Sequence, residues 1–290
     1  MMLALASLLF LPLLLPVAST YSPGACSGDC LVLDPSIIQR TSDGRYFRFG
    51  TGGGIQMSTA DYIKGPWMKQ PEVLSGGSTM RVPGANFDNI WVCRPNPLPS
   101  PIVLKLMLHA FSKQAPEVHS IGGQYVLYYC ISDNGKTTSA IGVATSPTMD
   151  PGSWTDHGSV GIGTDSSSLY NAIDPNWIII GSKPYLNFGS AFAGLQQVEM
   201  QGAFSKVPTA VPRQISYNSS GGHMQEGSYM FQYGNYYYLL FSAGINTYPN
   251  NAKISPGQEY RIVMCRSLSG TGDFVSIYTM FYYIYITSGD

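Results

Sequence analysis

Four segments of the chain share one pattern, in which a tight turn is followed by a strand-like run rich in aromatic residues. The turns contain Asp-Gly, Gly-Gly, Gly-Ser or Gly-Asn pairs, and the segments begin at Asp43, Gly122, Gly181 and Tyr233. Turn dipeptides of this kind before alternating hydrophobic residues are typical of β-hairpins. Each segment therefore predicts a β-strand that is entered through a tight turn.

Three of these strands are followed by another β-type segment that ends in serine, at 55–58, 141–146 and 262–267. Aligning the four copies gives intervals of 79, 60 and 52 residues between Tyr46, Tyr125, Tyr185 and Tyr237. A repeat of about 50–60 residues made of short strands has the size of a four-stranded propeller blade. The pattern predicts an all-β propeller in which about four blades are recognisable.

The composition supports a turn-rich β protein. Charged residues make up 11% of the 290 residues, against roughly 25% in an average soluble protein. Glycine (32) and tyrosine (20) are abundant, which argues against coiled coils and charge-rich disordered chains. The net charge is −1 and there is no basic run, so binding to nucleic acid is not expected.

The first residues indicate secretion. Residues 1–19 read as a signal peptide, with an apolar run that is too short and too proline-interrupted for a typical membrane span. We therefore expect an extracellular protein that no longer contacts a membrane after the signal is removed. Five cysteines remain, of which Cys26 and Cys30 are close enough to bridge a tight loop, but the pairing is not readable from the sequence.

Each predicted blade also has an acid shortly before its aligned tyrosine. These acids are Asp34, Glu117, Asp174 and Glu226. The first strand of a propeller blade lines the central channel, so equivalent positions converge on one axis. We expect at least three of the acids to meet at one mouth of the channel. The alternative is that some only cap turns, because Asp-Pro is a common turn former.

Clustered carboxyl groups suit glycoside hydrolysis. That reaction uses one carboxylic acid to protonate the leaving oxygen and one carboxylate as base or nucleophile. A third carboxylate can raise the pKa of the acid and orient it. Abundant aromatic rings supply flat faces for sugars, whereas the sequence has neither a Gly-x-Ser-x-Gly elbow nor a dinucleotide-binding glycine motif after a strand.

Three motifs carry a family resemblance. Leu33-Asp34-Pro35-Ser36, Asn171-Ala-Ile-Asp174-Pro-Asn-Trp177 and Gln225-Glu226-Gly-Ser-Tyr229 resemble, in order and spacing, the catalytic motifs of the arabinanases of glycoside hydrolase family 43, in particular secreted fungal ones. The resemblance implies a five-bladed β-propeller that cleaves the α-1,5-arabinofuranose backbone of arabinan in pectin with inversion. It implies that Asp34 is the general base, Glu226 the general acid, and Asp174 the group that tunes and positions the acid.

The resemblance also suggests further contacts. Glu117 matches an acid of the Trp-Ala-Pro-Asp/Glu motif, whose Trp would be Trp91, and both are candidates for binding substrate. Asn171, Trp177 and Ser190 lie in or beside matched motifs and are weaker candidates. The expected partner is arabinan or its oligosaccharides, bound by a monomer. No cofactor is required for the chemistry; a structural calcium in the channel is a family feature, but its ligand region is missing from this sequence.

Two regions depart from the family pattern. Residues 92–114 interrupt the motif after Trp91, and removing these 23 residues shortens the first interval to 56. We interpret them as a translated intron, because Val-Cys can encode a splice donor and Gln can end in AG; the alternative is a surface-loop insertion. The tail 276–290 stands where a last blade would be expected. The catalytic domain then spans 20–275, and we expect this product to be poorly folded or weakly active.

Three other functions stay open on the sequence alone. The same acids serve exo-acting arabinofuranosidases and xylosidases, a non-catalytic propeller could bind carbohydrate, and the two anomalous regions could belong to an inactive product.

Overall fold

A computed structural model describes residues 25–82, 114–132, 135–219, 224–245, 254–255, 258–272 and 274–280. These residues form β-strands and contain no helix, arranged as four antiparallel sheets. The predicted signal peptide, Trp91 and almost all of the predicted insertion 92–114 lie outside the described residues.

Each sheet is built from strands that are consecutive in the chain. The first contains β1 (Ser36–Gln39), β2 (Tyr46–Gly50), β3 (Gln56–Ala60) and β4 (Met68–Gln70). The second contains β5 (Gln114–Ile121), β6 (Gln124–Ser132), β7 (Ser139–Ser146) and β8 (Thr155–Thr164). The third contains β9 (Asn176–Ile180), β10 (Lys183–Phe188), β11 (Leu195–Gln201), β12 (Ser205–Lys206) and β13 (Arg213–Ser216). The fourth contains β14 (Gln225–Tyr233), β15 (Tyr236–Ala243), β16 (Arg261–Ser267) and β17 (Val275–Met280).

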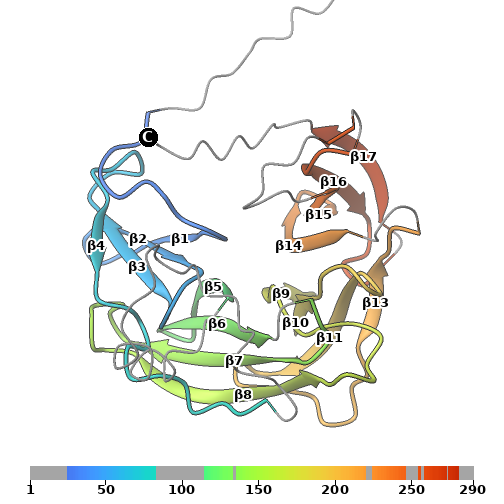
Figure 1. The fold of residues 1–290 in the computed structure, drawn as a ribbon, viewed down its shortest axis with the longest axis horizontal. Coiled ribbons are helices and arrows are strands. Elements are labelled where there is room, and N and C mark those ends of the chain that lie inside the picture. The colour runs from blue at the N-terminus through green and yellow to red at the C-terminus, as the bar shows by residue number, and fades with distance from the viewer. Residues whose placement is uncertain are drawn as a thin grey trace, which may run out of the picture.

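The four sheets are arranged around a common centre as the blades of a propeller. In Figure 1 the first strand of each sheet, β1, β5, β9 and β14, lies nearest the middle, and later strands lie progressively outward. The four aligned tyrosines all fall in second strands, β2, β6, β10 and β15. The prediction of an all-β propeller with four recognisable blades is confirmed, whereas the fifth blade implied by the resemblance is not among the described strands.

The hydrophobic core lies between neighbouring blades. Side chains of a strand alternate between its two faces, so β6 sends Leu127 and Tyr129 into a cluster with the first sheet and Tyr128 into a cluster with the third. This explains why nearly every residue of β6 is buried. In β15 buried and half-buried residues alternate instead, and its buried residues, such as Leu239, pack in a third cluster against the third sheet.

The described N-terminal segment joins the first blade. Cys26 and Cys30 form a disulfide, a pairing that the sequence left open, and Gly28 forms a β-bridge with Trp67 just before β4. At the edges of the two anomalous regions, Gln114 is already part of β5, and β17 takes in the first residues of the tail 276–290. None of the described residues forms a helix long and apolar enough to cross a membrane.

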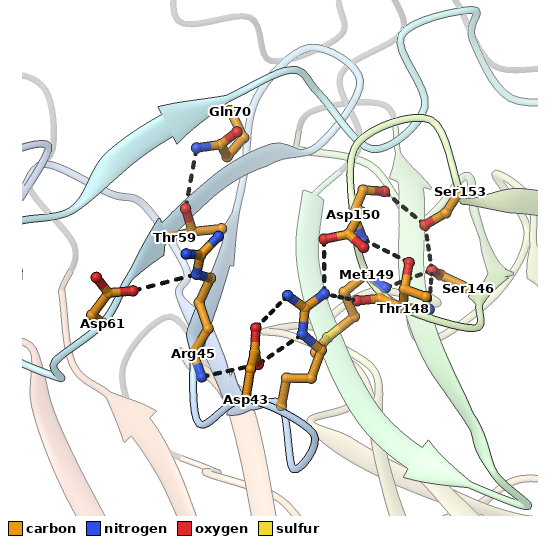
Figure 2. A network of polar contacts seen from close by, with 11 residues as sticks. Asp43, Arg45, Thr59, Asp61, Gln70, Ser146, Thr148, Met149, Asp150 and Ser153 are labelled. Carbon is orange, nitrogen blue, oxygen red and sulfur yellow. Dashed lines mark hydrogen bonds and ion pairs between the residues drawn. The ribbon is translucent and has the colours of Figure 1, made fainter.

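A polar network fastens the first blade to the second (Figure 2). Arg40, which follows β1, donates hydrogen bonds of 2.9 and 2.7 Å to the two carboxylate oxygens of Asp43. It also reaches Asp150 Oδ1 at 2.8 Å and the Thr148 carbonyl oxygen at 2.5 Å, both in the turn between β7 and β8. Its guanidinium group lies 4.7 Å from the centre of the Phe47 ring. One side chain thus connects a turn of one blade to a turn of the next.

We predict that Arg40→Met lowers the melting temperature by a few degrees at pH 7, because Asp43 and Asp150 lose their shared partner. Hydrogen bonds from Arg40 hold the pKa of Asp43 at about 2 and that of Asp150 below its ordinary value. A lowered folded-state pKa stabilises the protein above the unfolded pKa near 4, and this stabilisation disappears as pH falls toward 2. The difference in melting temperature between variant and wild type should therefore shrink from pH 4 to pH 2 in calorimetric scans.

Arg45→Met is the matched control for Arg40→Met. Its ion pair with Asp61 is 3.3 Å long and both side chains are exposed, so water screens it. It should leave the melting temperature nearly unchanged. Equal losses of melting temperature from the two variants would contradict the proposed role of Arg40 in joining the two blades.

Candidate active site

Asp34 and Asp174 occupy equivalent positions in two blades. Each lies two residues before the inner strand, is followed by proline and has a left-handed backbone, with φ of 49° and 55°. Asp is one of the few residue types that adopts this conformation readily. The same left-handed position is held by Ala115 (φ 43°) in the second blade and Gly227 (φ 61°) in the fourth.

The four acids are therefore not all at equivalent positions, which corrects the sequence-based alignment. Glu117 lies two residues after the left-handed position of its blade, and Glu226 lies one residue before it. The register supports this correction, because Glu117 pairs with Tyr128 in the second blade just as Ser36 pairs with Phe49 in the first.

Three of the acids influence one another electrostatically. Loss of hydration among the surrounding protein atoms is the main cause that raises the pKa of Asp34, and the charge of Glu226 adds to it, although the residue as a whole is exposed. Burial also raises the pKa of Asp174 well above its ordinary value, and the charges of Glu226 and Asp34 raise it further. Asp34, Asp174 and Glu226 thus come from three different blades into one group of carboxyls, as a shared site requires.

A hydroxyl group holds Asp34 in place. Thr51 Oγ1 donates a 2.5 Å hydrogen bond to Asp34 Oδ2 and accepts a 2.8 Å bond from the backbone N–H of Ala115. The backbone N–H of Thr51 donates to the Leu33 carbonyl oxygen at 2.9 Å. Thr51 therefore ties the carboxylate of the first blade to the left-handed residue of the second.

Asp174 is linked directly to the neighbour of Glu226. Its Oδ2 accepts a 2.9 Å hydrogen bond from the backbone N–H of Gly227. This bond joins the left-handed residue of the third blade to that of the fourth. The carboxylate of Asp174 therefore positions the backbone that carries Glu226.

Glu226 receives one hydroxyl donor on each carboxylate oxygen. Ser190 Oγ donates to Oε2 at 2.8 Å, and the Tyr260 hydroxyl donates to Oε1 at 2.7 Å. Ser190 is itself held by its backbone N–H, which donates to Asn171 Oδ1 at 2.8 Å. Both Ser190 and Asn171 are buried. Ser190 and Asn171, the weaker candidates for substrate binding, thus support the carboxylate of Glu226 in this structure.

Glu117 has a different set of contacts. Its carboxylate accepts hydrogen bonds of 2.5 Å from the Trp177 backbone N–H and from Asn176 Nδ2, and Oε1 lies 3.0 Å from His119 Nε2. The residue is buried. These contacts join the inner strand of the second blade to that of the third, so Glu117 serves the packing of the blades.

The structure also corrects the assignment of Trp177 as a binding residue. Its ring stacks on Tyr128 with the ring centres 5.7 Å apart, and the side chain is buried in the cluster between the second and third blades. A ring covered in this way has no face left for a sugar. Asp174, in the same motif, lies in the site, whereas the Trp177 side chain points into the core.

Two residues of the site were not predicted from the sequence. Thr51 opens a glycine-rich turn in the sequence, and the only signal for a further role is its position directly after a predicted strand. Tyr260 lies in a segment with no strand pattern, and no sequence signal distinguishes it from the other tyrosines. Among the residues that the structure describes, no group of three or more His, Cys, Asp or Glu side chains is arranged to hold a metal ion.

Comparisons with known proteins identify the family of the chain. The sequence profile of the Glycosyl hydrolases family 43 matches residues 100–272, more than half of the chain. A probable arabinan endo-1,5-alpha-L-arabinosidase C from Aspergillus niger is 47% identical over 266 residues, which cover 91% of this chain and 76% of the relative. The chain belongs to glycoside hydrolase family 43.

Solved arabinanase structures share the fold. A GH43 endo-arabinanase from Bacillus licheniformis superimposes with a TM-score of 0.65 at 26% identity, covering 86% of this chain and 76% of that one. An exo-1,5-alpha-L-arabinanase from a bovine ruminal metagenomic library gives a TM-score of 0.63 at 26% identity, covering 86% and 79%. This family 43 chain thus resembles both an endo-acting and an exo-acting enzyme in fold.

We predict that Asp174→Asn stabilises the fold at pH 7 by a few degrees in melting temperature. Because folding raises the pKa of Asp174, its ionisation works against the folded state. That penalty is absent below the unfolded pKa of about 4 and grows as pH rises toward the folded pKa. Asparagine tolerates the left-handed backbone and can still accept from Gly227. Melting scans from pH 4 to 8 should show a gain that vanishes at the acidic end.

Asp156→Asn provides a control of opposite sign. Burial is the strongest influence on Asp156 and raises its pKa, but hydrogen bonds from Tyr129 and Thr79 outweigh it and leave the pKa lowered. This variant should therefore lose stability at pH 7. A loss of stability in Asp174→Asn as well would refute the idea that the clustered charges strain the fold.

Proposed function

We propose that this family 43 chain hydrolyses the α-1,5-linked L-arabinofuranose backbone of arabinan. The observation that carries the proposal is the convergence of three carboxyl groups from three blades, each fixed by hydrogen bonds. The 47% identical relative is named as an arabinan endo-1,5-alpha-L-arabinosidase, which points to the same polysaccharide.

The proposed reaction is a single displacement with inversion. Asp34 accepts a proton from water while the water oxygen attacks the anomeric carbon. The bond from that carbon to the leaving sugar oxygen breaks, and Glu226 donates its proton to that oxygen. Asp174 orients the acid, because it holds the backbone next to Glu226 through Gly227. Inversion requires room for water, so we expect the carboxyls of Asp34 and Glu226 to be about 6.5–9.5 Å apart.

We propose endo cleavage as the mode of action, because the 47% identical Aspergillus niger relative is named as an endo enzyme. Exo cleavage is the second candidate, supported by the similarity in fold to an exo-arabinanase. Early products separate the two: a mixture of oligosaccharides from linear arabinan indicates endo cleavage, and arabinose alone or a single short oligosaccharide indicates exo cleavage. We further propose that residues 1–19 direct the enzyme out of the cell, where pectic arabinan is found.

We predict that Glu226→Gln and Asp34→Asn each lower kcat on linear arabinan by about 1,000-fold or more, because each removes one of the two proton-transferring groups. Reducing-sugar release measures the rate, and proton NMR of the first product shows its anomeric configuration, which inversion makes β.

Glu199→Gln is the matched control, since it removes a carboxylate whose partner is the exposed Lys183 on β10. It should retain wild-type turnover. Full activity of Glu226→Gln, or an α-configured first product, would each defeat the proposed mechanism, and binding of arabinan without any turnover by the wild type would indicate a carbohydrate-binding propeller.

A further inference from the structure

The Glu226 carboxylate is held by two hydroxyl groups of different mobility. Ser190 and Tyr260 each donate to one of its oxygens, at 2.8 and 2.7 Å. A serine hydroxyl can rotate to donate or to accept. The Tyr260 hydroxyl has a second polar neighbour, the Ser242 side chain, and Ser242 is the cross-strand partner of Glu226. Its oxygen is therefore restrained from two directions.

The backbone around Tyr260 is also closely fitted. The N–H of Ile245 donates to the Gln258 carbonyl oxygen at 2.8 Å, and Ile245 forms a β-bridge with Glu259. Gly244 permits this approach: its φ is 112°, and a Cβ built on it would overlap the Glu259 carbonyl oxygen. A side chain at position 244 would thus push away the segment that ends in Tyr260. The position of the phenol is a consequence of this local packing.

The phenol remains a proton donor at working pH. Burial raises the pKa of Tyr260 well above its ordinary value, and the nearby charge of Glu226 raises it further. A neutral phenol has one O–H proton to donate. With Ser242 on its other side, Tyr260 directs that proton to Glu226 Oε1.

We propose that Tyr260 is a positioning residue for the general acid, which keeps Glu226 Oε1 as an acceptor and so places the catalytic proton on Oε2, the oxygen beside Ser190. A protonated carboxyl has one O–H and one carbonyl oxygen, and a fixed donor selects the carbonyl oxygen. In the transferring step the Oε2–H bond breaks as the proton moves to the leaving sugar oxygen, and the electron pair stays on the carboxylate. The inference rests on the proposed role of Glu226 as the acid.

The experiment is Tyr260→Phe, assayed on two substrates that differ in their need for an acid. Linear arabinan has a poor leaving group that must be protonated, whereas a 2,4-dinitrophenyl glycoside of an α-1,5-arabino-oligosaccharide does not need protonation. We expect kcat on arabinan to fall by about 10- to 100-fold, a part of the contribution of general acid catalysis, with KM changed by less than about 3-fold. On the dinitrophenyl substrate kcat should change by less than about 3-fold, since the acid is not used there.

Two controls separate positioning from a structural role. Tyr233→Phe removes the same hydroxyl from an exposed tyrosine at the far end of β14 and should keep wild-type rates on both substrates. Ser242→Ala removes the second neighbour of the phenol and should give a smaller, equally selective loss on arabinan. An equal loss on both substrates in Tyr260→Phe, or unchanged turnover of arabinan, overturns the inference.

Glu226→Gln, assayed in parallel, keeps the two proposals distinguishable. It should show the same selectivity as Tyr260→Phe with a larger loss on arabinan. If Glu226→Gln retains turnover of arabinan, the proposed function of the site is wrong. If Glu226→Gln loses it and Tyr260→Phe does not, only the role of Tyr260 is wrong.

Discussion

The structure depends on how the backbone N–H groups at the unpaired edges of the inner strands find hydrogen-bond acceptors. An inner strand pairs with the second strand of its own blade on one edge only, so N–H groups on the other edge need acceptors from elsewhere. Side chains of the preceding blade supply them: Val118 N–H donates to Ser36, Trp177 N–H to Glu117, and Met230 N–H to Asn176. A buried N–H left without an acceptor would cost about 1–3 kcal/mol. The repeated contact therefore fixes the position of each of these three blades, along the propeller axis, relative to the blade before it.

The position of the clustered carboxyls follows from this contact. Three residues before each of the donors lies the left-handed residue of the blade, which is Ala115, Asp174 or Gly227. The repeated contact brings these residues to the same level, where Thr51 binds the N–H of Ala115 and Asp174 binds that of Gly227. The hydrogen bond that Asp174 accepts from Gly227 is thus both a contact between two blades and a part of the site.

The blades were readable from the sequence because local signals repeat. A turn pair before an aromatic run marks the second strand each time, and Tyr125 and Tyr237 fall at the same place in β6 and β15. The three catalytic candidates were also predicted correctly as neighbours. The equivalence of the four acids was not, because the turns between first and second strands differ in length and Tyr46, Tyr125 and Tyr185 fall at different places in their strands. A residue count from the tyrosines cannot detect these differences.

The remaining differences have a common physical reason. Trp177 lies three residues after Asp174, yet the pleat of β9 turns its ring into the core. Proximity in the sequence does not tell which face of the strand a side chain occupies. Tyr260 reaches the site only because the chain returns past Gly244, a tertiary contact that leaves no periodic signal. Residues that support a site from a distant segment are therefore the hardest to predict from one sequence.

The site imposes an energetic cost that the blades around it must offset. Burial and like charges raise the pKa of Asp174, so its ionised form opposes folding. The stabilisation lies elsewhere, in the three hydrophobic clusters between adjacent blades. Glu226 comes from the fourth blade, whose strand β15 buries only alternate residues. Its carboxylate is nevertheless fixed from two sides, by Ser190 of the third blade and Tyr260 of its own, so precise placement of the acid depends on hydrogen bonds more than on burial.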